Sequence, residues 1–397
     1  MLVRTDRVSR WRSPVTLQTY VNTYLREALP LCILLADHNL HGWFCESFIQ
    51  IFTRRWNRND EAVESIDYLD SVNVNPSYTV DTLIGDVQVK AEASVSRFLI
   101  DAIADGQCAV IFLDEFYVRA KASYGRHHFI HESLVFGYDR TGQVFQVIGL
   151  DRNAIFTFQE ISRDEVDAGF GSVATLVSAQ QESCVDRLGY WIKLIRRRHL
   201  QEGYPFSVRR FRAEVCDYLL GTGSPVKVFE RFGVDITRLE GGGQVHVLNF
   251  GVNCYADLQR QLAASVEDNR RFDYRAFHLL AEHKRAMRER LRFSELVLPE
   301  QGDDLDLAVN FTPVVARFEA VRRLALSCRY ADPYVRDELL TRLSVMLRDA
   351  ETQEREILRA IVNELDMRSD RLSDVRGDAH VRVAARECPW CEALPVE

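Results

Sequence analysis

The sequence predicts an α+β protein of two domains, a mixed N-terminal domain and a mainly helical C-terminal one. Its 397 residues exceed the roughly 150 residues of a typical domain by a factor of two to three. Short apolar runs bounded by turns occur before Gly203-Tyr-Pro205, and helical spacing with charged outer faces follows it. We therefore expect domains at 1–205 and 206–397, and allow for residues 245–265 to pack on the first of them.

The N-terminal domain shows strand patterns separated by turn residues. Cys108–Leu113 is a fully apolar run after a glycine turn, which is typical of a buried strand. Ser133–Tyr138 and Val144–Ile148 flank a short turn containing Gly142, so they predict a β-hairpin. Ala154–Phe158 and Tyr190–Ile195 are expected to add two further strands.

The C-terminal domain carries long amphipathic patterns. Phe272–Arg292, Pro313–Cys328 and Pro333–Met367 predict three helices. In the third, apolar residues recur mostly every three or four positions, at Leu339, Leu343, Met346, Ala350, Ile357, Ile361 and Leu365.

Composition excludes several classes of protein. Hydrophobic residues make up 47% and charged residues 27%, which is the average of globular proteins and not of disordered or fibrous chains. The longest uncharged apolar run, Ala28–Ala36, is too short for a membrane span, and no apolar run follows the arginines of Met1–Pro14 as a secretory signal requires. Nine irregularly spaced cysteines indicate reduced thiols. We expect a cytoplasmic protein that uses neither a membrane nor, at a net charge of −8, nucleic acid as its main partner.

Cys45 is the candidate nucleophile. It follows Asn39 by six residues and is expected to open an amphipathic helix, whose N-terminal dipole and unpaired N–H groups would favour the thiolate. The Asn39 side chain could then donate to the oxygen that becomes negative during attack on a carbonyl, as half of an oxyanion hole. Cys32 is the rival thiol, but no amide residue precedes it at this spacing, so we interpret it as a core residue.

His131 and Asp151 complete a candidate triad. His131 lies at the start of the predicted hairpin, and Asp151 follows the return strand by a few residues. The hairpin would bring the two together, so that Asp151 orients the imidazole while its other nitrogen pairs with the thiolate. Cysteine, then histidine on one strand, then aspartate after the next is the chain order of papain-like enzymes.

Three segments resemble the N-terminal domain of the butirosin biosynthesis protein H family. They are Asp114-Glu-Phe-Tyr117, His128-Phe-Ile-His131 and Leu134-Val-Phe-Gly-Tyr-Asp139, and Asn249-Phe-Gly-Val-Asn-Cys-Tyr255-Ala-Asp-Leu258 is similar to a later motif of the same proteins. The resemblance covers about residues 30–265. It implies a papain-like fold in residues 1–205, with Cys45 as nucleophile, His131 as base and Asp151 as orienting acid, although Asn39 stands where papain-like folds usually carry glutamine.

The same resemblance implies a function in the biosynthesis of natural products such as antibiotics. A cysteine of this family accepts an acyl group from the thioester of an acyl or peptidyl carrier protein and passes it to an amine, forming an amide. No cofactor of the enzyme itself is expected, because the carrier brings its own phosphopantetheine. The triad with water as acceptor would instead give a thioesterase or amide hydrolase, and a third alternative is a catalytically silent binding protein of the same fold.

Further residues are candidates for substrate and partner binding. Asp114 and Tyr117 are assigned to the substrate, with Asp114 preferred to Glu115 because neighbouring residues on a strand point to opposite sides. His127, His128 and His131 lack acidic or cysteine partners at ligand spacing, and Cys388 and Cys391 lack a second ligand pair, so no metal is expected. Trp191–Arg212 holds seven basic residues against one acidic residue, a patch to which an acidic carrier protein would dock. The docking residues proposed are Arg196, Arg197, Arg198, Arg209 and Arg210.

Overall fold

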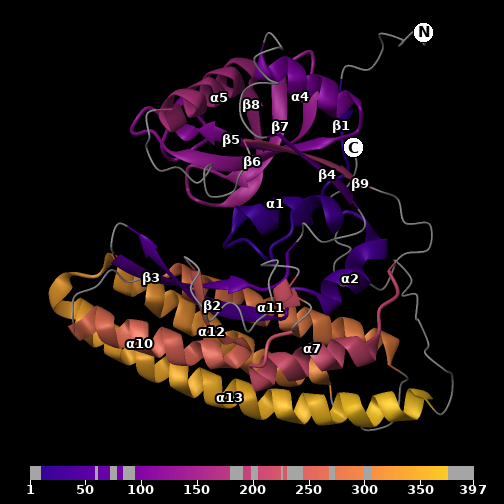
Figure 1. Ribbon diagram of the computed structural model, residues 1–397, viewed down its shortest axis with the longest axis vertical. Coiled ribbons are helices and arrows are strands. Elements are labelled where there is room, and N and C mark those ends of the chain that lie inside the picture. The colour runs from indigo at the N-terminus through magenta and orange to yellow at the C-terminus, as the bar shows by residue number, and fades with distance from the viewer. Residues whose placement is uncertain are drawn as a thin grey trace. The chain divides into compact units, whose positions relative to one another are not determined.

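The computed structural model is an α+β structure of two compact units (Figure 1). It describes residues 10–58, 61–71, 78–83, 94–178, 191–197, 204–224, 227–229, 245–267, 273–298 and 306–373. Unit 1 comprises Met1–Asp37 and Asn75–Gln201, and unit 2 comprises His38–Val74 and Glu202–Glu397. This division differs from the predicted boundary at residue 205, because 38–74 groups with the C-terminal half and residues 245–265 do so as well.

Unit 1 is built on an antiparallel sheet, of seven strands within the described residues, in the order β4-β9-β5-β6-β7-β8, with β1 also pairing with β6. The strands are β1 (Arg10–Arg12), β4 (Tyr78–Leu83), β5 (Cys108–Asp114), β6 (Ile130–Asp139), β7 (Val144–Leu150), β8 (Phe156–Ser162) and β9 (Ile192–Arg197). The expected buried strand and hairpin are β5 and β6–β7, so these predictions are confirmed, and the two further strands appear as β8 and β9.

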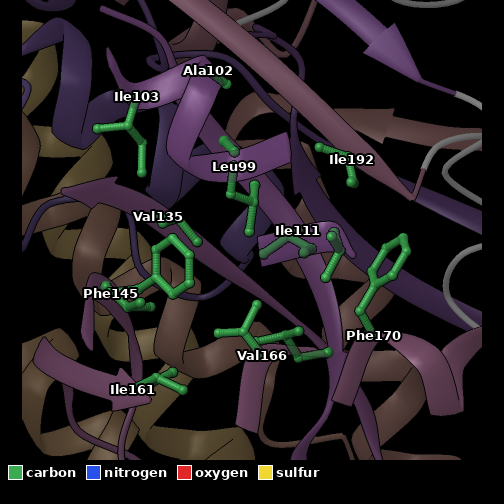
Figure 2. Close-up of a cluster of buried hydrophobic side chains, with 14 of the residues drawn as sticks. Leu99, Ala102, Ile103, Ile111, Val135, Phe145, Ile161, Val166, Phe170 and Ile192 are labelled. Carbon is green, nitrogen blue, oxygen red and sulfur yellow. The ribbon is translucent and has the colours of Figure 1, made fainter. Parts of the chain in front are cut away.

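Helices cover both faces of this sheet (Figure 1). Two of them, α4 (Val95–Ala104) and α5 (Arg163–Ser178), lie on one face, and α1 (Leu25–Leu34) lies on the other. Ser94 caps α4 by accepting a hydrogen bond from the amide of Arg97, which satisfies one of the free donors of the first turn. Figure 2 shows the core between the sheet and α4 and α5, in which side chains from alternate strand positions interdigitate with both helices.

Unit 2 combines a small antiparallel sheet with a set of helices. Its strands, in the order β10-β2-β3, are β2 (Ile51–Arg58), β3 (Glu61–Tyr68) and β10 (Val245–Phe250). The helical elements are η1 (His38–Leu40), α2 (His41–Glu46), α7 (Val208–Leu220), η4 (Gly251–Asn253), α10 (Cys254–Glu267), α11 (Arg275–Val297), α12 (Leu307–Tyr330) and α13 (Pro333–Ser373). The three predicted helices are α11, α12 and α13, so the helical character of this half is confirmed.

The buried stripe of α13 includes one charged residue. The stripe consists of Leu340, Leu343, Leu347, Ala350, Glu354, Leu358, Ile361 and Leu365. Glu354 pairs with Lys284 of α11 at 2.6 Å, and neither side chain is exposed. Tyr218 and Tyr255 donate hydrogen bonds to the same carboxylate. Each partner of this cluster comes from a different helix, so the ion pair ties α7, α10, α11 and α13 together.

Candidate functional site

The end of β5 positions two adjacent carboxylates in unit 1. β5 is buried over its whole length, and the 3₁₀ helix η3 (Glu115–Tyr117) follows it directly. Asp114 caps η3 by accepting from the amide of Phe116 at 3.2 Å. Because the chain leaves extended geometry at this point, the alternation rule that excluded Glu115 no longer applies. Each carboxylate holds a histidine from the start of β6 or just before it.

Asp114 is paired with His128. The distance between Asp114 Oδ2 and His128 Nδ1 is 2.6 Å, and the same carboxylate accepts from the hydroxyl of Ser172 at 2.7 Å and the amide of Phe129 at 3.1 Å. Burial alone would raise the pKa of Asp114, but these hydrogen bonds outweigh it and lower that pKa. The carboxylate has no exposed surface, so it fixes His128 and is unavailable to hold an acceptor amine as predicted.

Glu115 is paired with His131. Glu115 Oε1 lies 3.1 Å from His131 Nδ1, and Glu115 Oε2 accepts from the hydroxyl of Ser123 at 3.3 Å. A carboxylate can only accept, so Nδ1 carries a proton, and in the neutral ring the lone pair is then on Nε2. A quarter of the His131 side chain is exposed, whereas Glu115 is buried. This is a carboxylate-oriented imidazole whose free nitrogen can act as a base.

Asp151 does not perform the orienting role predicted for it. Its Oδ1 accepts from the amides of Asn153 and Ile155, both at 2.8 Å, in the turn that follows β7. These bonds, that from Ile155 first, lower the pKa of Asp151. Of the described carboxylates, Glu115 is the one hydrogen-bonded to the His131 ring, so the structure assigns the role to Glu115 in place of Asp151.

Aromatic side chains surround the two histidines. Phe129 lies 5.1 Å from the His131 ring and Phe116 lies 4.6 Å from the His128 ring, measured between ring centroids. Tyr117, predicted to bind substrate, lies 6.2 Å from the His128 ring and is exposed, as is Phe129. The imidazoles therefore lie beside apolar surface that can contact an acyl chain.

Cys45 belongs to unit 2 and lies in a different setting from the one predicted. The helix α2 begins at His41 and ends at Glu46, so Cys45 lies in its last turn and does not open it. The chain then enters β2, which pairs with β3 and β10 instead of continuing as a helix. The dipole argument for a thiolate is therefore wrong, because the carbonyl end of a helix disfavours negative charge. The Cys45 side chain has no exposed surface.

Other residues around Cys45 are structural. Arg290 of α11 is buried and donates to the carbonyls of Phe44, Ser47 and Phe48 at 2.8–3.3 Å, which satisfies the carboxyl end of α2. Asn39 is exposed in η1, where its carbonyl accepts from the amide of Tyr204. An oxyanion donor and the nucleophile that it assists must both contact the substrate. Asn39 is exposed but the sulfur of Cys45 is buried, so the two side chains do not meet this requirement.

The two thiols of unit 1 that lie within the described residues, Cys32 and Cys108, are unsuited to nucleophilic attack at neutral pH. Burial raises the pKa of Cys32 to about 12 and that of Cys108 to about 11. Both are buried in the core of the unit, as the sequence predicts for Cys32. Among the described residues of unit 1, the reactive groups that lie together are therefore the imidazoles of His128 and His131 and not a sulfur.

The basic segment is divided between the two units. Arg196 and Arg197 end β9 in unit 1, and Arg196 forms an ion pair with Asp105. Arg209 and Arg210 begin α7 in unit 2, and Arg210 binds the buried carboxylate of Glu46 at 2.7 Å. A strand and a helix therefore carry these charges. Arg198 lies outside the described residues, as do Cys388 and Cys391.

Unit 1 also contains a cavity of about 300 Å³ at the other end of the sheet. Its lining includes Trp11, Arg12, Cys108 and Arg197. Cys108 begins β5 and Asp114 ends it, so the cavity and the paired histidines lie about 20 Å apart along the strand. The cavity is therefore separate from the candidate site.

Searches for metal sites and membrane spans gave no candidate in the part of the chain that is described. No group of three or more histidine, cysteine, aspartate or glutamate side chains is arranged to hold a metal ion there. Likewise, none of the described helices is long and apolar enough to cross a bilayer. Comparison with known proteins found no matching family model and no matching curated protein.

Proposed function

We propose that this protein transfers an acyl group from a carrier-protein thioester to an amine, with His131 as the general base. The observation that carries the proposal is the pair of Glu115 Oε1 and His131 Nδ1 at 3.1 Å beside a partly exposed ring. The resemblance to the butirosin biosynthesis protein H family supplies the substrate class and the setting in natural-product biosynthesis. The hydrogen bond between Glu115 and His131 supports their proposed roles as orienting acid and base.

The reaction is a direct displacement in which His131 moves one proton. The amine nitrogen attacks the thioester carbon, a C–N bond forms, and Nε2 of His131 takes the proton released from the amine. The tetrahedral intermediate then collapses, the C–S bond breaks, and the imidazolium returns the proton to the leaving thiolate of the phosphopantetheine arm. Glu115 stabilises the imidazolium that exists between these two steps. No enzyme thiol and no further cofactor takes part.

Kinetics of variants test the base. Purified protein is assayed with thioesters of N-acetylcysteamine that differ in acyl chain, with and without a panel of amines. We expect His131→Gln to lower kcat/KM by about 10²–10⁴-fold, the usual contribution of a general base, and Glu115→Gln by about tenfold or more. Asp151→Asn should stay within about threefold, because asparagine retains the acceptor of its turn. Full activity of a folded His131→Gln variant would refute the proposal.

Product analysis separates transfer from hydrolysis. An amide formed only when the amine is present identifies a transferase, and a free acid in either condition identifies a thioesterase or amide hydrolase that uses the same imidazole. Both products require proton transfer by His131, so the distinction concerns the acceptor and not the base.

The covalent route through Cys45 remains the second mechanistic candidate. The positive charge of Arg290 acts on Cys45, and a guanidinium near a sulfur favours its thiolate. An acyl-enzyme on Cys45 would be visible as a mass shift after incubation with thioester, and Cys45→Ser would abolish turnover. Direct transfer predicts neither result, because a sulfur without exposed surface does not meet the substrate.

Carrier docking is proposed for the arginines whose charge is not used in an ion pair. Arg197 in unit 1 and Arg209 in unit 2 have no carboxylate partner among the described residues, in contrast to Arg196 and Arg210. Charge reversal at Arg197 or Arg209 should raise KM for the carrier-bound substrate at low salt and leave the small thioester unaffected. Equal loss on both substrates would place that arginine in folding instead.

A binding protein without catalysis is the second candidate function. The observation that favours it is the burial of Cys45, together with the exposed aromatic side chains of Tyr117 and Phe129 beside the histidines. Such a protein would bind an acyl thioester in a titration and release it unchanged over hours, with or without amine.

A further inference from the structure

The cavity of unit 1 lies where the end of α4, the start of β5 and the segment Trp11–Pro14 meet. Its volume of about 300 Å³ is at the lower end of the range of small-molecule sites. Ile33, Cys108 and Ile195 in its lining are buried, whereas Arg12 is exposed. The cavity therefore has a largely apolar floor and a rim that meets solvent.

The charged side chains in the lining are two arginines, Arg12 and Arg197, and the lining contains no carboxylate among the described residues. Arg12 donates from Nε to the side-chain oxygen of Gln146. The guanidinium of Arg197 has no hydrogen-bond or ion-pair partner within the part of the chain that the structure describes. A partly buried charge without a partner is costly, and a bound anion would offset that cost.

The register of β9 against β5 directs Arg197 toward the cavity. Cys108 pairs directly with Ile195, and both line the cavity. Arg197 is two residues beyond Ile195, so its side chain leaves the same face of the sheet. Burial raises the pKa of the Cys108 thiol to about 11, although the charge of Arg197 acts to lower it, as a guanidinium on that face should. Gly106 leaves space in the lining, because a Cβ atom there would meet nothing within 4 Å.

The negative groups beside the cavity are already bound. Asp105, at the end of α4, pairs with Arg196 of β9, which the alternation of the strand directs to the face opposite Arg197. The carbonyls of residues 101–103, in the last turn of α4, accept from the backbone amides of residues 105–107. These groups therefore compete little with an incoming anion for Arg197.

We propose that this cavity binds a small organic anion, with its carboxylate or phosphate group on Arg12 and Arg197 and its apolar body against Trp11 and the isoleucines of the floor. A guanidinium presents N–H groups in a fork that matches the oxygens of both anions. The apolar floor favours an organic ligand over a bare inorganic ion, because the ligand buries apolar surface there. The inference does not rest on the proposed function, since the cavity is about 20 Å from the paired histidines along β5.

Calorimetric titration of the full-length protein with four probes tests the class of ligand. Benzoate and phenyl phosphate carry both an apolar ring and a charge, benzyl alcohol carries the ring alone, and inorganic phosphate carries the charge alone. We expect benzoate or phenyl phosphate to bind at one molecule per chain, and the other two probes to bind at least about tenfold more weakly. The better of the first two probes identifies the anionic group as a carboxylate or a phosphate.

Replacement of Arg197 tests the residue. Arg197→Met should weaken binding of the better probe by about tenfold or more, the usual loss when a hydrogen bond to a charged group is removed. Two control variants remove the same charge elsewhere. They are Arg196→Met at the preceding position of β9 and Arg209→Met in unit 2. Each should change the dissociation constant by about twofold or less, because attraction between exposed charges is screened by salt.

Modification of the wild-type thiols is a second measurement, which holds even if Arg197→Met does not fold. Cys108 lines the cavity, whereas Cys32 is buried in the same unit but does not line it. At a probe concentration about ten times its dissociation constant, the reaction of Cys108 with methyl methanethiosulfonate should slow about tenfold, because the occupied cavity blocks the reagent. The rate at Cys32 should not change. Peptide mass mapping measures both rates.

Several results would overturn the site. They are no binding of benzoate or phenyl phosphate below about 10 mM, an equal loss in Arg197→Met and the two control variants, or equal protection of Cys32 and Cys108. Equal affinity for benzyl alcohol or for inorganic phosphate would overturn the class of ligand. None of these measurements uses a thioester. Binding without turnover therefore supports this inference while the proposed function fails, and turnover without binding does the reverse.

Discussion

Unit 1 and unit 2 each contain a buried lysine, a glutamate and a histidine, but the histidine is partly exposed in unit 1 and fully buried in unit 2. In unit 1 the carboxylate of Glu115 is buried but the ring of His131, which it holds, is a quarter exposed. In unit 2, Lys284, Glu354 and His283 have no exposed surface. His283 donates from Nε2 to the carbonyl of Ile49 at 2.8 Å and accepts from Lys284 through Nδ1. Residue types alone therefore do not mark a reactive site, because a free ring nitrogen that meets solvent is also needed.

The buried ion pair of Lys284 and Glu354 in unit 2 should contribute more to stability than a partly exposed ion pair on the same helix. Glu354→Ala leaves the ammonium of Lys284 buried without its partner, which we expect to lower the free energy of unfolding by about 3–5 kcal/mol. Glu351→Ala on the same helix is the control, because its ion pair with Arg355 is partly exposed and should contribute less than about 1 kcal/mol. Urea denaturation followed by circular dichroism measures both. Equal stability of the two variants would mean that the Lys284–Glu354 pair is not what holds the helices.

The pH dependence of stability should differ in sign between a lysine of unit 1 and one of unit 2. The pKa of Lys121 is about 8 in the folded protein against 10.5 in the unfolded chain, so the unfolded chain binds more protons between these values. Stability relative to Lys121→Met should therefore rise with pH across this window, by on the order of 3 kcal/mol.

Lys227 in unit 2 gives the opposite case. Burial lowers its pKa, but the charges of Asp70 and Glu214 outweigh burial and raise that pKa above 10.5. Its contribution is present below pH 10.5 and is lost above it. Stability relative to Lys227→Met should therefore fall as the pH rises past 10.5. Denaturation of the wild type and both variants at several pH values gives the two slopes, and slopes of the same sign would contradict the contrast.

The two histidines should separate stability from activity. His283→Phe leaves the Ile49 carbonyl without its donor in the core, and should cost about 1–3 kcal/mol of stability. His131→Gln removes a partly exposed ring and should change stability by about 0.5 kcal/mol or less, while the proposed function requires kcat/KM to fall by about 10²–10⁴-fold. Thermal denaturation with the thioester assay on each variant is the measurement. A large loss of stability in His131→Gln would assign this ring to the fold.

Local patterns in the sequence were sufficient to predict much of the secondary structure of unit 1. The hairpin of β6 and β7 could be predicted because its turn and its apolar runs are contiguous, and β5 because a fully apolar run after Gly106 leaves few alternatives. The long helices of unit 2 follow from their spacing. The stripe predicted for α13 was correct at four positions, Leu343, Ala350, Ile361 and Leu365. At the other three, the next residue along the chain is the buried one: Leu340, Leu347 and Leu358 in place of Leu339, Met346 and Ile357.

The helix expected from Cys45 onward does not form, because this segment becomes strand β2 and pairs with a distant part of the chain. Ile49, Ile51 and Phe52 fit an amphipathic helix equally well by spacing, but Thr53 is paired with Asn249, 196 residues further along the chain. No pattern in a short window reveals such a partner. Glu115 was missed for a local reason. The rule that neighbouring residues on a strand point to opposite sides was applied to it, although β5 ends one residue earlier, at Asp114. The sequence therefore indicated His131 as a candidate but not Glu115, the carboxylate that pairs with it.

The pairing of β2 with β10 has a consequence for synthesis of the chain on the ribosome. The hairpin of β2 and β3 is translated early, and ends at Tyr68, but the third strand, β10, begins only at Val245, about 180 residues later. At roughly 5–20 residues per second, that delay is on the order of 10–40 s. Throughout this time the edge of β2 has free backbone donors and acceptors, which makes it an adhesive surface for other nascent chains. Codon choice or a chaperone acting during this interval would therefore affect the yield of folded protein.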